Sequence, residues 1–168
     1  VYLATRAAGA GVPDSLLVRH DFAGVFGVEL YVEAEQAVAC WNRLLEIGRP
    51  VGLRPVGWSA INTLRIEAGI PWYGRDIDEE VVPAETGQAA RAVSHVKGCY
   101  LGQEIVERMR SRGVVANNLV ALRFAGAGVG PRTVLKAGEA ELGRVTSVCH
   151  SPMLGAWIGL GYVRSSHA

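Results

Sequence analysis

The sequence changes character at Asn117-Asn118, and this change limits the chain to a fold of mixed type. Before this point, apolar residues recur at helical spacing in residues 34–47, 55–69 and 103–111. After it, glycine-rich turns separate short alternating apolar stretches at residues 119–124, 133–135, 143–148 and 156–163. Such spacing is typical of a small antiparallel barrel or sandwich. We therefore predict an α+β chain, with a mixed domain over residues 1–114 and an incomplete β-barrel over residues 115–168.

Composition and charge narrow the class of protein. The chain has 168 residues, 49% of them apolar and 20% charged, which describes a globular protein. Its formal charge of +1 gives no long-range attraction to nucleic acid, and no apolar run has the length of a membrane-spanning helix. The three cysteines are too widely spaced for a disulfide framework or a Cys-x-x-Cys metal site, so we expect a reducing, cytoplasmic location. Because the chain starts at Val1 without methionine, we expect a fragment of a longer protein.

Two segments before the change carry polar side chains that could bind a ligand. Residues 28–32 alternate as a strand, which puts Glu29 and Tyr31 on one face, although a carboxylate there is most often simply solvated. In the helix expected from Pro55 to Gly69, Trp58 and Arg65 lie together on one flank of the predicted apolar stripe. The stripe consists of Gly57, Ala60, Ile61, Leu64 and Ala68. A guanidinium beside an indole can hold a planar ligand or a carboxylate. The alternative is an arginine that packs its stem and reaches water.

Two other features have structural interpretations. Gly48 follows the helix expected over residues 34–47, where a left-handed glycine commonly ends a helix. The acidic run from Asp76 to Glu80 could be taken for a metal cluster. Acids at a helix entry more often cap the helix and face water, so we expect no metal site there.

The stretch from Lys97 to Glu104 places one thiol, Cys99, just before the helix expected over residues 103–111. Gly98 allows a sharp turn, and Gly102 lets the chain enter the helix. The positive end of the helix dipole and Lys97 would both favour the thiolate. The competing interpretation is a small buried hydrophobic residue whose reactivity has no role.

The same stretch, Lys97-Gly98-Cys99-Tyr100-Leu101-Gly102-Gln103-Glu104, resembles the signature of folate-binding YgfZ-type proteins. These are relatives of the glycine cleavage T-protein, the aminomethyltransferase. Three further segments resemble this superfamily in the same order: residues 27–32, residues 63–77, and residues 143–147 with Ser151-Pro152. T-proteins have an acidic version of the cysteine segment, so the form seen here resembles the YgfZ branch.

The resemblance implies a tetrahydrofolate site. Glu29 would hydrogen-bond the pterin ring, and Arg65, Trp58 and Tyr31 would complete the folate-binding residues. Residues 1–114 would then be the C-terminal portion of the folate-binding domain. Cys99 becomes a candidate reactive thiol, with a thiol-exchange role and a structural role both open. The motif residues are Lys97, Gly98, Cys99, Tyr100, Gly102, Gln103 and Glu104.

The function that the resemblance implies is folate-dependent support of iron–sulfur cluster assembly or repair in client enzymes, including enzymes that modify tRNA. The partners would be folate and iron–sulfur client or assembly proteins, with no direct nucleic-acid or membrane contact. This favours an accessory factor over an aminomethyltransferase, because Val25 and Phe26 stand where T-proteins place adjacent acidic residues. The T-protein catalytic aspartate belongs to an N-terminal half that this sequence does not include. The alternatives are a glycine-cleavage-type aminomethyltransferase and a folate-independent interaction module.

Overall fold

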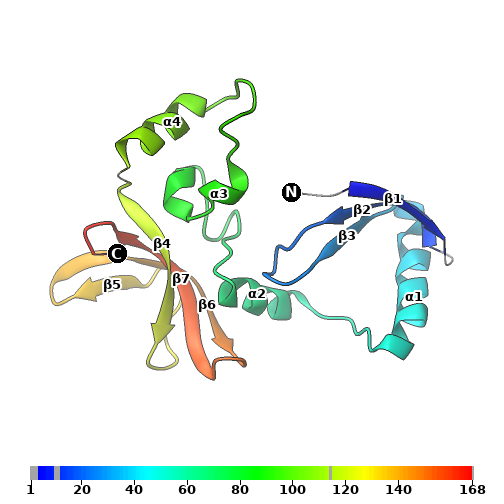
Figure 1. The fold of residues 1–168 in the computed structure, drawn as a ribbon. Helices are drawn as coiled ribbons and strands as arrows, with labels where there is room; N and C mark the ends of the chain where they lie inside the picture. Colours follow the sequence, from blue (N-terminus) through cyan, green and yellow to red (C-terminus); the bar gives the residue numbers. More distant parts are fainter. Residues whose placement is uncertain (1–3, 10–11, 114, 168) are drawn as a thin grey trace. The chain divides into compact units, whose positions relative to one another are not determined.

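A computed structural model of the chain describes residues 4–9, 12–113 and 115–167. Two compact units divide the chain, residues 1–65 and residues 66–168. The predicted α+β fold class is confirmed (Figure 1). The predicted domain boundary falls at residue 114, which lies outside the described residues, and it stays a prediction. The elements, in chain order, are β1 (Ala4–Gly9), β2 (Val12–Arg19), β3 (Val28–Tyr31), η1 (Ala34–Gln36), α1 (Ala37–Gly48), η2 (Arg49–Val51), α2 (Trp58–Glu67), η3 (Pro83–Thr86), α3 (Ala89–Ala92), α4 (Gln103–Arg112), β4 (Asn117–Phe124), β5 (Val134–Ala137), β6 (Ala140–Ser151) and β7 (Ala156–Arg164).

The first unit contains an antiparallel sheet in the order β1-β2-β3, drawn in blue in Figure 1. In the β2–β3 hairpin, Val18 lies opposite Glu29 and Leu16 lies opposite Tyr31, so these four side chains share one face. Leu16 and Tyr31 are 42% and 55% exposed, whereas Ser15 on the other face is buried. The face that carries Glu29 is therefore accessible to solvent, and Val28 on the opposite face is also 48% exposed.

The loop between β2 and β3 is closely connected to the strand ends. The backbone N–H of Gly27, the last residue of this loop, donates to Asp21 Oδ1 at 3.0 Å. A Cβ atom at Gly27 would lie 2.4 Å from the carbonyl oxygen of His20, so the hairpin requires glycine there. The guanidinium of Arg19 lies 4.6 Å from the centroid of the Phe26 ring and donates to Asp21. These contacts hold the loop that leads into β3.

Helix α1 corrects the expectation for Gly48. This residue has φ −86° and is the last residue of α1, and the chain continues into the 3-10 turn η2. The left-handed residue is Gly52, with φ +85°. The reason is packing: a Cβ at Gly48 would lie 2.6 Å from Cβ of Leu53, so glycine is needed for a close approach and not for its dihedral angle.

Helix α2 corrects both the predicted start and the predicted apolar stripe. It begins at Trp58, three residues after Pro55, because the carbonyl of Gly57 accepts the first helical hydrogen bonds, from the N–H groups of Ala60 and Ile61. Leu64 is 37% exposed, whereas Arg65 and Ile66 are 0% and 2% exposed. Apolar residues occur all round this helix, so periodicity alone could not identify the buried face.

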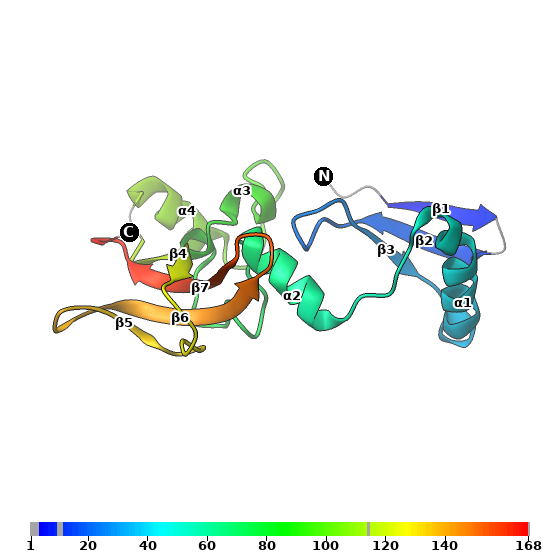
Figure 2. The ribbon, with the colours of Figure 1, turned by 90° about the horizontal axis from the view of Figure 1, so that it is seen from below.

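The second unit is built on an antiparallel sheet in the order β4-β7-β6-β5, as Figure 2 shows from below. Its core is formed by Ile66, Ile158 and Leu160, with Leu119 and Cys149 packed against them. The central strand β7 is the most buried element of the chain's described part. The sheet matches the predicted antiparallel region after Asn117.

The loop after α2 is joined to this sheet through Asp76, which corrects the expectation of helix capping and, for this one acid, of solvent exposure, whereas Asp78, Glu79 and Glu80 face water as expected. Asp76 is 3% exposed, and no helix begins there. Its Oδ1 accepts from Thr146 Oγ1 at 2.5 Å and from Ser147 Oγ at 2.6 Å, and its Oδ2 accepts from the backbone N–H of Trp72 at 3.0 Å. Adjacent strand residues normally point to opposite faces, but the register of β6 shifts between Val145 and Ser147. This irregularity lets both hydroxyls reach one carboxylate.

Within the described ranges, no helix is both long and apolar enough to cross a membrane. The same residues contain no group of three or more His, Cys, Asp or Glu side chains that could hold a metal ion.

Candidate functional site

Glu29 lies on an accessible face of the three-stranded sheet with both carboxylate oxygens hydrogen-bonded. Its Oε1 is 2.7 Å from Nδ1 of His20, and its Oε2 accepts from the hydroxyl of Tyr31 at 2.5 Å. The side chain of Glu29 is 33% exposed, so it remains accessible to a ligand. The prediction that Glu29 and Tyr31 share a face is confirmed, and the two residues are in direct contact.

These contacts keep the carboxylate of Glu29 ionised. The hydrogen bonds from Tyr31 and then from His20 lower the pKa of Glu29 below its usual value of 4.5. The reciprocal effect raises the pKa of Tyr31, so its hydroxyl remains a donor. An ionised carboxylate only accepts hydrogen bonds, so Nδ1 of His20 carries a proton in this contact. The carboxylate has about four acceptor positions, and these two donors occupy two of them.

Arg65 is placed very differently from Glu29, because its side chain is fully buried within α2 and its surroundings. Nε and Nη2 donate to Oδ1 of Asn62 at 3.0 and 2.8 Å. The alternative of an arginine that reaches water is therefore wrong. A buried guanidinium is retained only where acceptors satisfy it, so Arg65 is held in a defined position.

Trp58 does not share the environment of Arg65. Its side chain is 73% exposed at the first residue of α2, whereas Arg65 is buried. The described hydrogen bonds of Arg65 go to Asn62, which lies between them in the sequence. Stacking of a ligand between the indole and the guanidinium stays a prediction.

Tyr31 also borders a cavity of about 350 Å³ on the sheet, whose other lining residues are Arg6, Asp14, Ser15, Leu16, Val32 and Glu33. Arg6 and Asp14 form an exposed ion pair at 3.3 Å in this lining. The cavity therefore offers space and polar groups beside Tyr31.

The cysteine motif lies in the second unit, and Cys99 is an exposed free thiol. The interpretation of Cys99 as a buried hydrophobic residue is therefore wrong.

The other motif residues lead into helix α4. Gly102 has φ +88° and precedes α4, which begins at Gln103, whereas Gly98 is not among the left-handed glycines. The ammonium of Lys97 lies 4.6 Å from the centroid of the Tyr100 ring. Glu104 pairs with Arg108 one turn along α4, as an exposed ion pair.

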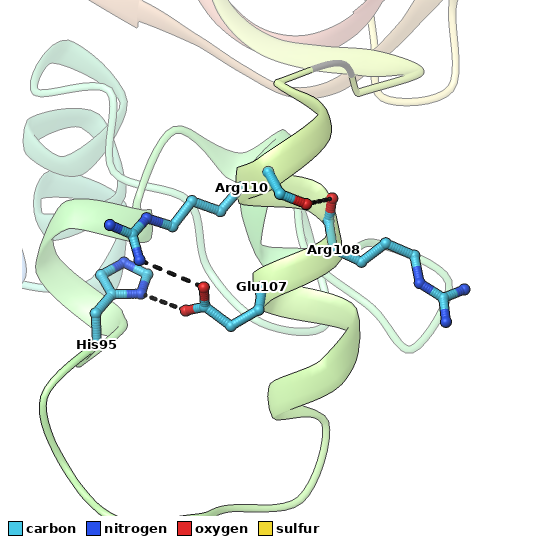
Figure 3. A network of polar contacts seen from close by, with 5 residues as sticks. His95, Glu107, Arg108 and Arg110 are labelled. Atoms are coloured by element: carbon cyan, nitrogen blue, oxygen red, sulfur yellow. Dashed lines mark hydrogen bonds and ion pairs between the residues drawn. The ribbon is translucent and has the colours of Figure 1, made fainter.

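A polar network connects the segment before Cys99 to helix α4. Figure 3 shows the carboxylate of Glu107 between the ring of His95 and the guanidinium of Arg110. The distances are 2.9 Å from Nδ1 of His95 to Oε1 and 3.3 Å from Arg110 to Oε2. The hydrogen bond from His95 is the largest cause that lowers the pKa of Glu107. His95 also lines an apolar cavity of about 300 Å³ between α4 and the η3–α3 segment.

His20 is the residue of this site that sequence reasoning missed. A signal was present: the β2–β3 hairpin puts Val18 opposite Glu29, and His20, two residues later, falls on the same face. The sequence of residues 16–20 also predicts a strand, and pairing it with residues 28–32 as one hairpin would have brought the imidazole next to the carboxylate.

Both parts of the chain match known protein families. The GCVT N-terminal domain family matches residues 2–97, and the glycine cleavage T-protein C-terminal barrel domain matches residues 117–168. An aminomethyltransferase from Caldanaerobacter subterraneus is 34% identical over 99% of this chain and 44% of that protein. One from Symbiobacterium thermophilum is 38% identical over the same shares.

The fold agrees with that of a solved structure, glycine cleavage system aminomethyltransferase T from Bartonella henselae. The TM-score is 0.79 at 23% identity, and the match covers 92% of this chain and 43% of that one. The chain thus spans less than half the length of the relatives it matches. Their names support the T-protein side of the predicted resemblance, whereas membership of the YgfZ branch stays a prediction. Because the N-terminal domain family covers more than half of the chain, the chain belongs to the glycine cleavage T-protein family.

Proposed function

We propose that this chain forms a tetrahydrofolate-binding part of a protein of the aminomethyltransferase type. The observation that carries the proposal is the ionised, doubly anchored carboxylate of Glu29 on an open sheet face. The ring of a pterin presents adjacent N–H and amino donors, and a carboxylate with two acceptor positions left can accept both. The names of the relatives favour the aminomethyltransferase alternative over the iron–sulfur accessory role.

The other predicted folate-binding residues have distinct roles in this proposal. Tyr31 orients Glu29 and borders the cavity in which a ligand could extend. Arg65 acts as a fixed positive charge, and Trp58 as an exposed aromatic surface for a planar ring. The reaction of the whole protein would transfer a one-carbon unit to tetrahydrofolate, with release of ammonia from an aminomethyl-lipoyl carrier. A cytoplasmic location stays part of this proposal.

Calorimetric titration of tetrahydrofolate into the full-length protein tests the assignment of Glu29. A hydrogen-bonded charge of this kind contributes on the order of 1.5–3 kcal/mol, so Glu29→Ala should weaken binding at least about tenfold. Glu35→Ala, an exposed glutamate in the same unit, is the matched control and should bind like wild type. Equal binding by the Glu29→Ala and wild-type proteins would show that the pterin lies elsewhere. No binding by wild type would favour a folate-independent interaction module.

A second candidate function rests on the exposed thiol of Cys99 in its motif. This is the YgfZ-like role, folate-dependent support of iron–sulfur enzymes, including tRNA-modifying ones. Cys99→Ser should then lower iron–sulfur enzyme activity in cells without changing tetrahydrofolate affinity. Ammonia release from an aminomethyl-lipoyl carrier that is unchanged in Cys99→Ser would instead support the transferase.

A further inference from the structure

We infer that His20 is a positioning residue for ligand recognition at Glu29, and that its Nδ1–H fixes which carboxylate positions face the ligand. The inference rests on the proposed function and adds a residue that the fold comparison does not assign. It starts from the distance of 2.7 Å between Nδ1 of His20 and Oε1 of Glu29.

The imidazole is itself held in place. The backbone N–H of His20 donates to the carbonyl of Gly27 at 3.0 Å, which continues the hairpin beyond β2. The ring lies 5.3 Å from that of Phe22, tilted by 39°. The close approach of Gly27 and the hydrogen bond from its N–H to Asp21 fix the loop on the other side. The donor therefore comes from a structured part of the hairpin.

A glutamate side chain needs such an anchor, because it has three rotatable bonds and Glu29 is one-third exposed. The hydroxyl of Tyr31 holds Oε2 alone, and rotation about that contact would still be possible. His20 holds the other oxygen, so the two contacts together set the plane of the carboxylate. Immobilising a side chain of this kind before binding is worth about a three- to tenfold gain in affinity.

The arrangement also makes the site selective for ligand chemistry. With Oε1 and Oε2 each engaged by a protein donor, each oxygen has one acceptor position left. A ring edge with two adjacent donors, such as the 2-amino and N3–H groups of a 2-amino-4-oxopyrimidine, satisfies both. A 2-methyl analogue that lacks the amino group leaves one position unsatisfied, and such a loss is usually discriminated strongly. Without His20, a freely turning carboxylate should discriminate less.

Two substitutions of His20 test its hydrogen-bond donor and its aromatic ring separately. His20→Asn keeps an N–H close to the place of Nδ1 but removes the ring. His20→Phe keeps the ring against Phe22 but removes the donor. Both variants, wild type and Glu29→Ala are titrated calorimetrically with tetrahydrofolate and with its 2-desamino-2-methyl analogue, in the full-length protein. Thermal melting shows that each variant is folded.

If His20 positions Glu29, His20→Phe should bind tetrahydrofolate about three- to tenfold more weakly than wild type, and His20→Asn within about twofold. The preference for tetrahydrofolate over the analogue should fall in His20→Phe and persist in His20→Asn. The opposite order, with Phe like wild type and Asn weak, would overturn the inference in favour of a packing role for the ring. If the wild-type protein binds no tetrahydrofolate, the proposed function itself is overturned. If the wild type binds tetrahydrofolate and His20→Phe binds it equally well, only the inference about His20 is overturned.

Discussion

Replacing Asp76 by alanine is the most direct test of how the second unit is held together. The carboxylate is 3% exposed and accepts hydrogen bonds from the side chains of Thr146 and Ser147 and from the backbone of Trp72. It is the acceptor that joins the loop after α2 to strand β6. Its removal should therefore loosen the loop from the sheet.

The size of the effect follows from what each donor can do afterwards. Thr146 Oγ1 also lies 3.1 Å from the carbonyl oxygen of Leu160, so its hydroxyl can turn to that acceptor. The Ser147 hydroxyl and the Trp72 N–H lose the acceptor described for them. Hydrogen bonds to a charged group contribute about 1.5–3 kcal/mol each, so we expect Asp76→Ala to lower the free energy of unfolding by about 3–5 kcal/mol. The melting temperature should fall by roughly 10 °C.

Urea unfolding of the full-length protein, followed by tryptophan fluorescence, measures this change. Trp72 and Trp157 both belong to the second unit and report on it. Asp76→Asn keeps one oxygen for the hydroxyls but turns an amide toward the Trp72 N–H, so we expect a smaller loss of about 2 kcal/mol. Glu79→Ala, an exposed acid of the same run, should stay within about 0.5 kcal/mol of wild type. If Asp76→Ala lost less than about 1 kcal/mol, the cost of burying the carboxylate would cancel its hydrogen bonds and our reasoning would fail.

Two further predictions concern the cysteine motif and its anchor. Gly102 has φ +88°, so Gly102→Ala should destabilise the protein by about 1–2 kcal/mol in urea unfolding. Gly98 lies outside the left-handed region, so Gly98→Ala should be close to neutral. Equal effects of the two substitutions would contradict this reasoning. The hydrogen bond from His95 lowers the pKa of Glu107 in the folded state. The stability that this bond contributes is therefore present above the carboxyl pKa of the unfolded chain, and it is lost as the pH falls through the pKa of the folded state. His95→Ala should therefore flatten the fall in stability below about pH 4.5, and an unchanged pH profile would exclude the linkage.

Local patterns predicted the elements whose apolar and polar residues separate cleanly. The alternation of residues 28–32 placed Glu29 and Tyr31 on one face, and the structure brings them into contact. Helix α4 begins at Gln103 as expected and ends within one residue of the predicted end. In both cases the signal lies within a few neighbouring residues, and no distant contact overrides it.

Features that depend on distant contacts could not be predicted in the same way. Asp76 looked like a solvated acid, because its partners are 70 and 71 residues away and meet it only through the irregularity in β6. His20 was missed because its role needs the pairing of two strands and not the pattern of one. Arg65 appears on the flank of the predicted stripe, but tertiary packing makes it the most buried residue of α2.

The order of strands in the second sheet has a consequence for how the protein forms during synthesis. Strand β7 lies between β4 and β6, yet it comes last of the four in the sequence. The β5–β6 hairpin can close as soon as it leaves the ribosome, because its strands are neighbours in the chain. Strand β4 must wait with both edges open until residues 156–164 have been made and inserted beside it. In the nascent chain, β4 is therefore the strand most exposed to mispairing, and a chaperone that covers it would protect this unit most.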